Sequence, residues 1–362
     1  MGNIVSYLEE FGDKTFKEMP FQEVDALVLS QFSYLKFDGL VPKLTDNTQG
    51  ISLAQMTEQM DEAVVFADER YEKENRLLFE GLLHSRRFGN MVCNYYSSII
   101  NEDVETQFCA MTCLLEGELP VVVFRGTDEN LVGWKEDFNM AFKKPVPGQK
   151  LSGLYINQVG LRIAEDFYVC GHSKGGNLAV YGSMNAFTDI QNRIKRIYSF
   201  DGPGFRPEIF SSERYDRVAE RIEKYIPRYA LVGMIMESHE DYIVVDSSYI
   251  GLLQHDPYSW KVEAASFVVK KEVKKSQQFM NEALNEWILK LDDEQLELFV
   301  ETLFLILEGC EAKNLIEMAY DWRKSLSGMI HATMHVDEST RVEIIEMIHM
   351  FFTVVKENLK KL

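Results

Sequence analysis

The sequence has few cysteines and no long hydrophobic run. Its five cysteines include no C-x-x-C pair, and an odd set without paired spacing indicates neither a disulfide framework nor a zinc site. We therefore expect reduced thiols and a cytoplasmic protein. No apolar run approaches the ~18 residues that span a bilayer, and no basic segment with an apolar stretch after it opens the chain. The sequence therefore predicts neither a transmembrane segment nor secretion.

Positive charge is also scarce. The chain has 38 Lys and Arg against 57 Asp and Glu, a net charge of −19, which repels a phosphate backbone and argues against nucleic acid as a partner. Repeats and low-complexity segments are absent, and 46% of the 362 residues are hydrophobic. A chain of this size and composition favours one large domain with a smaller appended unit. Nothing in the sequence indicates an oligomeric state.

The spacing of apolar residues changes along the chain. It is helical in much of the first hundred residues, and segments rich in Val, Ile, Phe and Tyr then alternate with helical stretches. The expected strands are Thr106–Leu115, Pro120–Phe124, Phe167–Cys170, Arg196–Phe200, Lys224–Ile226 and Tyr242–Val245. This alternation predicts an α/β domain over residues 1–265, with a mostly parallel central sheet flanked by helices. From about Ser266 onward amphipathic patterns predict a helical C-terminal extension over residues 266–362.

The segment Gly171–Gly175 (GHSKG) follows a short apolar strand and opens a helix. A serine raised on such a tight turn needs small residues two positions away on each side, because the backbone and adjacent strands pass close by. The helix N-terminus behind it favours negative charge. The pattern predicts Ser173 as a nucleophile and the N–H of Lys174 as an oxyanion donor. The alternative is a glycine-rich turn with a capping serine.

Several ordered motifs carry a family resemblance. The segment 122–128 (VVFRGTD) resembles the oxyanion strand and loop of class 3 (fungal-type) lipases. The segments 171–181 (GHSKGGNLAVY) and 200–205 (FDGPGF), with His255 and its neighbours, are similar to the bacterial, lipase-like Mbeg1-like family (DUF2974). The resemblance covers roughly residues 15–262 and implies an α/β-hydrolase fold. In the lipase pattern the residue after Arg-Gly donates its hydroxyl and N–H to the oxyanion, which implies that role for Thr127.

The histidine and the acid are expected later in the chain. His255 follows the strand expected at 242–245, and its surroundings resemble the histidine motif of class 3 lipases, so we expect it to be the base, with His239 as the alternative. Class 3 lipases carry their acid where Ala230 stands here. Asp201 instead follows the strand after the serine, where other α/β hydrolases, such as pancreatic-type lipases, supply the carboxylate.

Two alternatives to Asp201 remain open, namely Glu237 and Asp241. An Asp before Gly-Pro-Gly also commonly forms a turn, which is the alternative role for Asp201 itself. The pair His331 and His335 has the i, i+4 spacing of a metal site, but no Glu lies between the two and no third ligand is evident, so we expect no metal there.

Together these residues predict a serine hydrolase of the esterase or lipase type. It would act on a small-molecule or lipid ester and require no metal or organic cofactor. The segment 141–154 is a candidate lid or rim loop. Two rival hypotheses are a weak or inactive hydrolase-fold protein that binds a partner or lipid through its helical C-terminus, and an acyl-lipid sensor at a membrane surface. The absent lipase acid at Ala230 favours these rivals, whereas the intact Ser173, Thr127 and His255 favour catalysis.

Overall fold

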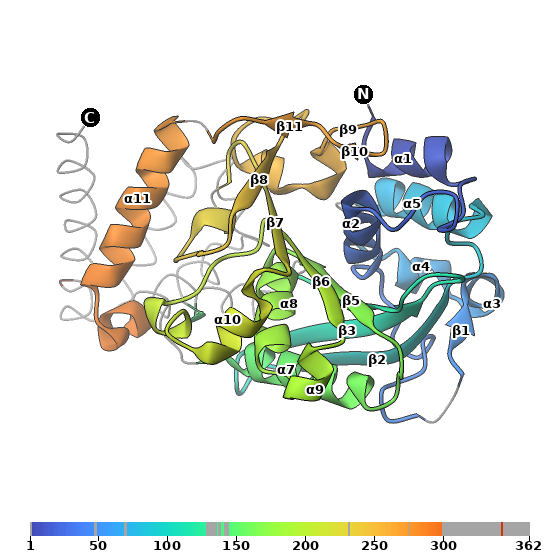
Figure 1. The fold of residues 1–362 in the computed structure, drawn as a ribbon, viewed down its shortest axis with the longest axis horizontal. Coiled ribbons are helices and arrows are strands. Elements are labelled where there is room, and N and C mark those ends of the chain that lie inside the picture. Colours follow the sequence, from blue (N-terminus) through green and yellow to red (C-terminus); the bar gives the residue numbers. More distant parts are fainter. Residues whose placement is uncertain are drawn as a thin grey trace. The chain divides into compact units, whose positions relative to one another are not determined.

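A computed structural model describes most of the first 298 residues (Figure 1). The described residues are 2–46, 49–68, 71–127, 136, 139–140, 145–230, 232–273, 275–298 and 342. The chain separates into two compact units. The first comprises Met1–Ile99, Phe108–Gly126 and Gly148–Lys274, and the second comprises Ile100–Gln107, Thr127–Pro147 and Lys275–Leu362. Ser173, Lys174, Asp201 and His255 belong to the first unit, and Thr127 belongs to the second.

The main feature of the first unit is a sheet with the strand order β1-β2-β3-β4-β5-β6-β7-β8-β11. Its strands are β1 (Ile51–Ser52), β2 (Val92–Asn101), β3 (Thr106–Leu114), β4 (Val121–Phe124), β5 (Phe167–His172), β6 (Ile194–Phe200), β7 (Ile222–Pro227), β8 (Tyr242–Val245) and β11 (Val269–Lys270). Strands β4 to β8 are parallel neighbours. Antiparallel pairs join β1 to β2, β3 to β4 and β8 to β11. This is an α/β-hydrolase fold with a mostly parallel centre, as the sequence predicted.

Helices of the first unit cover both faces of this sheet. The helices along the chain are α1 (Ile4–Phe11), α2 (Glu23–Phe32), α3 (Leu53–Gln59), α4 (Glu62–Val65), α5 (Glu72–His84), α7 (Pro147–Gly160), α8 (Lys174–Met184), α9 (Thr188–Gln191), α10 (Glu213–Ala219) and α11 (Lys275–Lys290). Val121 and Val123 of β4 join a core with α1, α2 and α5, whereas Val122 and Phe124 join a core with α7 and α8. Alternating side chains of a strand point to opposite faces, so one apolar run fills both cores.

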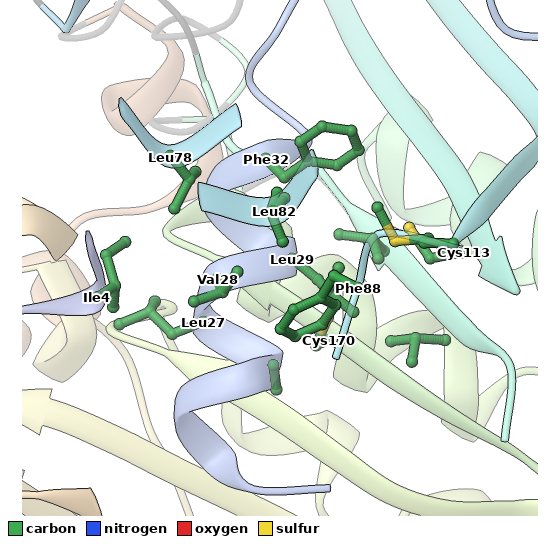
Figure 2. Packing of buried hydrophobic residues seen from close by; sticks show 14 of the residues in the cluster. Ile4, Leu27, Val28, Leu29, Phe32, Leu78, Leu82, Phe88, Cys113 and Cys170 are labelled. Carbon is green, nitrogen blue, oxygen red and sulfur yellow. The ribbon is translucent and has the colours of Figure 1, made fainter. Parts of the chain in front are cut away.

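Helix α2 is buried between α5 and the sheet. It packs against both α5 and β5, and all but its first residue are buried. Figure 2 labels Leu29 of α2, Leu82 of α5 and Cys170 of β5 among the side chains of one buried hydrophobic cluster. The four described cysteines are free thiols buried in the cores, while Cys310 lies outside the described residues. The N-terminal helices are therefore an integral layer of the domain that carries Ser173.

Strand structure continues past the expected domain boundary at residue 265. Strand β10 (Ser266–Phe267) pairs with β9 (Val262–Glu263), and β11 adds to the edge of the main sheet. Strands of two residues are too short to produce an alternating sequence pattern, which is why these were not expected. Helix α11 follows, and most of the helical extension expected over 266–362 lies outside the described residues. Among the residues described, no helix is long and apolar enough to cross a membrane.

Candidate active site

Ser173 occupies the sharp turn between β5 and α8. Its backbone has φ 59° and ψ −131°, a conformation that costs a non-glycine residue about 1–3 kcal/mol and persists only where the surroundings hold it. Here the Ser173 N–H donates to the carbonyl of Phe200 at the end of β6, at 2.9 Å, and the Ser173 carbonyl accepts from the N–H of Gly176, also at 2.9 Å. The turn is thus fixed to the neighbouring strand and to the first turn of α8.

The two glycines that flank this turn are required by close backbone contacts. A Cβ added to Gly171 would lie 2.2 Å from the carbonyl oxygen of Gly175, and one added to Gly175 would lie 2.2 Å from the carbonyl oxygen of Phe124. Backbone atoms cannot rotate away as the end of a flexible side chain can. The structure therefore confirms the physical reason for small residues two positions to each side of Ser173.

His255 joins Ser173 to Asp201 through its two ring nitrogens. It ends the 3-10 helix Gly251–His255. Its Nε2 lies 2.9 Å from Ser173 Oγ, and its Nδ1 lies 2.6 Å from Asp201 Oδ2. An ionised carboxylate only accepts hydrogen bonds, so Nδ1 carries the proton and Nε2 is left to accept from the serine hydroxyl. This is the arrangement in which a histidine can remove the proton of a serine.

Asp201 directly follows β6 and is fully buried. Three hydrogen bonds hold it in place. Its N–H donates to the carbonyl of Tyr225 at 2.7 Å. Its Oδ1 accepts from the N–H of Gly233 at 3.1 Å, while Oδ2 accepts from His255. Both carboxylate oxygens therefore have donors, as a buried charge requires. With φ 47° the residue also bends the chain after β6, so a local backbone role is compatible with the hydrogen bond to His255.

The alternative acid and base residues lie away from the ring of His255. The ring of His239 stacks on Phe210, with centroids 3.8 Å apart, and its Nε2 is 3.6 Å from Glu237 Oε2. The side chains of His239 and Glu237 are 55% and 43% exposed, and Asp241 is exposed as well. The structure thus brings together Ser173, His255 and Asp201, and does not bring His239, Glu237 or Asp241 into this hydrogen-bond chain.

The loop after β7 contributes to the site in a different way from the lipase pattern. Ala230, at the position that resembles the lipase acid, is buried with Ile226 and Val244. Three residues later the same loop supplies the Gly233 N–H that hydrogen-bonds to Asp201 Oδ1. The carboxylate thus comes from β6, and the loop that carries it in class 3 lipases provides a donor to it.

A substitution at Gly233 tests whether this loop positions the carboxylate of Asp201. A Cβ on Gly233 would lie 2.2 Å from Asp201 Oδ1. We expect Gly233→Ala to displace the carboxylate from His255 and to lower kcat for an ester substrate by ~10–100-fold, because misplacements of about 1 Å have effects of that size. Gly153→Ala on α7 is the matched control, since its new Cβ would make only an ordinary contact at 3.4 Å. Equal kcat values for the two variants would refute this role.

The two expected oxyanion donors come from different parts of the chain. Lys174 is the first residue of α8, so its N–H directly follows the serine. Thr127 belongs to the second compact unit and directly follows Gly126 of the first. A Cβ on Gly126 would lie 3.2 Å from Ser173 Cβ and 2.6 Å from the carbonyl oxygen of His172. The segment that follows β4 therefore approaches the serine turn at Gly126. The role of Thr127 as an oxyanion donor stays a prediction.

The sequence did not reveal the role of Asn177, whose side chain connects α8 by hydrogen bonds to the segment after Asp201. Its Nδ2 donates to the carbonyls of Pro203 and Gly204, at 3.1 and 2.9 Å, and its Oδ1 accepts from Gln149 Nε2 at 2.9 Å. The only signal in the sequence was an amide among the small and apolar residues that open α8. Its partners are 26 to 28 residues away, so no local pattern reveals them.

Metal ligands were not expected from the sequence. Within the described ranges, no group of three or more His, Cys, Asp or Glu side chains is placed to hold a metal ion. His331 and His335 lie outside those ranges, as does part of the candidate lid, residues 141–144.

Comparison with known proteins identifies the family. The chain matches the Mbeg1-like family over residues 82–305, more than half of its 362 residues, and it therefore belongs to that family, as its motifs predicted. No curated protein matches the sequence. Among solved structures, a crystal structure of M37 lipase is similar, with 16% identity, coverage of 59% of this chain and 70% of that chain, and a TM-score of 0.38. So distant a similarity carries no argument about function.

Proposed function

We propose that the protein is a serine hydrolase that cleaves a carboxylic or lipid ester. The observation that carries the proposal is the position of His255, with Nε2 2.9 Å from Ser173 Oγ and Nδ1 2.6 Å from a carboxylate oxygen of Asp201. A hydroxyl, an imidazole and a buried carboxylate in this order form the set of groups that transfers acyl groups through a covalent intermediate. The strained turn at Ser173 supports the same function, because strain of this kind concentrates at functional sites.

The reaction proceeds by two acyl transfers. His255 Nε2 takes the proton from Ser173 Oγ as the oxygen attacks the acyl carbonyl, and then gives that proton to the leaving alcohol. Water, deprotonated by the same nitrogen, next attacks the acyl-serine, and His255 returns that proton to Ser173 Oγ as the acid leaves. Asp201 stays ionised throughout and stabilises the imidazolium that forms in each half-reaction. The oxyanion is held by the Lys174 N–H and by the hydroxyl and N–H of Thr127, where one donor is typically worth ~3 kcal/mol.

An ester is favoured over an amide because the motifs resemble lipases. The test compares hydrolysis of short-chain and long-chain p-nitrophenyl esters with hydrolysis of the matching p-nitroanilides by the purified chain. We expect ester cleavage that exceeds anilide cleavage, and the chain length with the highest kcat/KM will identify the acyl group preferred. If no ester is hydrolysed by the folded protein, the proposed reaction is wrong.

Independence from metal is a separate prediction. Because the proton is removed by His255 and the oxyanion is held by N–H and hydroxyl donors, neither step uses a Lewis acid. Hydrolysis of a p-nitrophenyl ester is therefore expected to be unchanged after treatment with EDTA and removal of the chelator by dialysis. Loss of activity that added zinc restores would contradict this prediction without removing the role of Ser173.

The rival hypothesis of an inactive binding protein was motivated by Ala230 at the position of the lipase acid. The hydrogen bond between Asp201 and His255 supports catalysis over that rival, because the carboxylate function is supplied from β6 instead.

A further inference from the structure

His172, which stands between Gly171 and Ser173 in the serine turn, makes two hydrogen bonds that the proposed reaction does not use. Its ring is buried, with 4% exposure. Its Nε2 lies 2.9 Å from the backbone carbonyl oxygen of His255, and its Nδ1 lies 3.1 Å from the hydroxyl of Tyr34. These partners are 83 and 138 residues away in sequence. One imidazole thus connects the serine turn both to the segment of the base and to the turn after α2.

The partners determine which ring nitrogen of His172 carries the proton. A backbone carbonyl only accepts hydrogen bonds, so Nε2 must be the donor to His255. In the neutral imidazole Nδ1 is then the acceptor, and the Tyr34 hydroxyl donates to it. Tyr34 is itself buried, and its hydroxyl lies against the backbone of the β4 end, where a Cβ on Gly126 would approach it to 2.1 Å. The tyrosine therefore has little room to move away from His172.

A neutral ring at this position suits the chemistry of its neighbour. The centroids of the His172 and His255 rings are 4.6 Å apart, with the ring planes at 36°. His255 becomes positively charged while it holds the serine proton, and a second cation this close would oppose that charge. The hydroxyl of Tyr34 can donate to Nδ1 of a neutral His172 ring, so this hydrogen bond requires no second proton on His172. The pair Tyr34 and His172 thus holds the backbone of His255 without adding charge beside its ring.

We propose that His172 is a positioning residue for His255, and that the hydroxyl of Tyr34 holds the ring of His172 in place by its hydrogen bond to Nδ1. The Nε2–H of His172 holds the carbonyl of His255, so that the ring of His255 spans the distance between Ser173 and Asp201. The inference rests on the proposed function in that it assigns His172 to the same reaction, but the hydrogen bonds themselves are tested independently of activity.

The kinetic test uses variants that separate the hydrogen bond from the volume of the ring. His172→Gln keeps an N–H donor near the position of Nε2, whereas His172→Leu fills the space without one. We expect His172→Leu to lower the second-order rate of Ser173 labelling by a fluorophosphonate, and kcat for an ester, by ~10–100-fold with KM unchanged. His172→Gln should retain most of the rate, and Tyr34→Phe should show a smaller loss than His172→Leu. His84→Gln, at an exposed histidine that ends α5, is the control and should label as the wild type does.

Two kinetic outcomes would overturn the proposal. If His172→Leu labels at the wild-type rate, the carbonyl hydrogen bond does not position the base. If His172→Leu and His172→Gln lose the same amount, the ring acts through its packing alone. In both cases a wild type that labels at Ser173 leaves the proposed function intact.

The spectroscopic test does not depend on catalysis. Nitrogen-15 NMR of the imidazoles should show His172 as the neutral Nε2–H tautomer at pH 7, and Tyr34→Phe should shift the Nδ1 resonance of His172 because its hydrogen bond is lost. The downfield proton of His255 Nδ1–H, bonded to Asp201, should broaden or shift in His172→Leu and not in His84→Gln. An Nδ1–H tautomer for His172, or an unaltered His255 proton in His172→Leu, would refute the positioning role even if the wild type proved to have no hydrolase activity.

Discussion

Replacement of Ser173 by alanine is expected to lower kcat for a p-nitrophenyl ester by about a million-fold, because removal of the nucleophile abolishes the covalent pathway as a whole. His255 and Asp201 would keep their hydrogen bond but would have no hydroxyl to activate. The steady-state rates of wild type and Ser173→Ala, measured at the same protein concentration, provide the comparison. A variant that retains a tenth of the wild-type kcat would show that another group attacks the substrate.

A glycine variant separates this loss from any damage to the fold. Ser173 has φ 59°, where a Cβ is unfavourable and glycine is not. Ser173→Gly should therefore be as inactive as Ser173→Ala and yet unfold at a higher temperature than Ser173→Ala. Thermal unfolding of both variants measures this difference. Equal or reversed midpoints would show that the turn is not strained.

Replacement of Asp201 by asparagine is expected to lower kcat by up to ~10⁴-fold. The asparagine fits the space, but its amide can present an N–H to His255 Nδ1. The ring would then carry its proton on Nε2, where it cannot accept the proton of Ser173. Because substrate binding does not require this tautomer, KM should change little. The measurement is kcat and KM for one ester across the variant and its controls.

Glu237→Gln and Asp241→Asn are the matched controls, since each removes one carboxylate charge outside the hydrogen-bond chain, from a half-buried residue and an exposed residue respectively. Both should keep kcat within a small factor of the wild type. If one of them shows the large loss and Asp201→Asn does not, the acid is misassigned while the serine mechanism stands. If all three variants retain full activity, no carboxylate orients His255.

The serine turn was predictable from the sequence because its constraints are local. Gly171, Ser173 and Gly175 lie within five residues, and the backbone contacts that exclude larger side chains arise within the turn and from the adjacent strand β4. The alternation of apolar strands and helices likewise predicted the parallel centre of the sheet, since each strand and crossover is a contiguous segment. Membership of the Mbeg1-like family was predicted from the motifs and is confirmed.

Other parts of the site depend on contacts between distant segments. The Gly233 N–H reaches Asp201 across 32 residues, and the amide of Asn177 reaches the turn after Asp201 across 26 and 27 residues. Neither contact leaves a periodic or spaced pattern in the sequence. The hydrogen bonds that join His172 to Tyr34 and to His255 connect residues 138 and 83 positions apart. They are recognisable only once α2, β5 and the 3-10 helix Gly251–His255 are packed together. The oxyanion role of Thr127 stays a prediction.

The central claim, that Ser173 is an activated nucleophile, is tested most directly by labelling the purified protein with a fluorophosphonate probe and measuring its intact mass. The account predicts one label per chain, located at Ser173 by peptide mapping, and no label on Ser173→Ala. A folded wild type that remains unlabelled, or a Ser173→Ala protein that labels equally well, would contradict it.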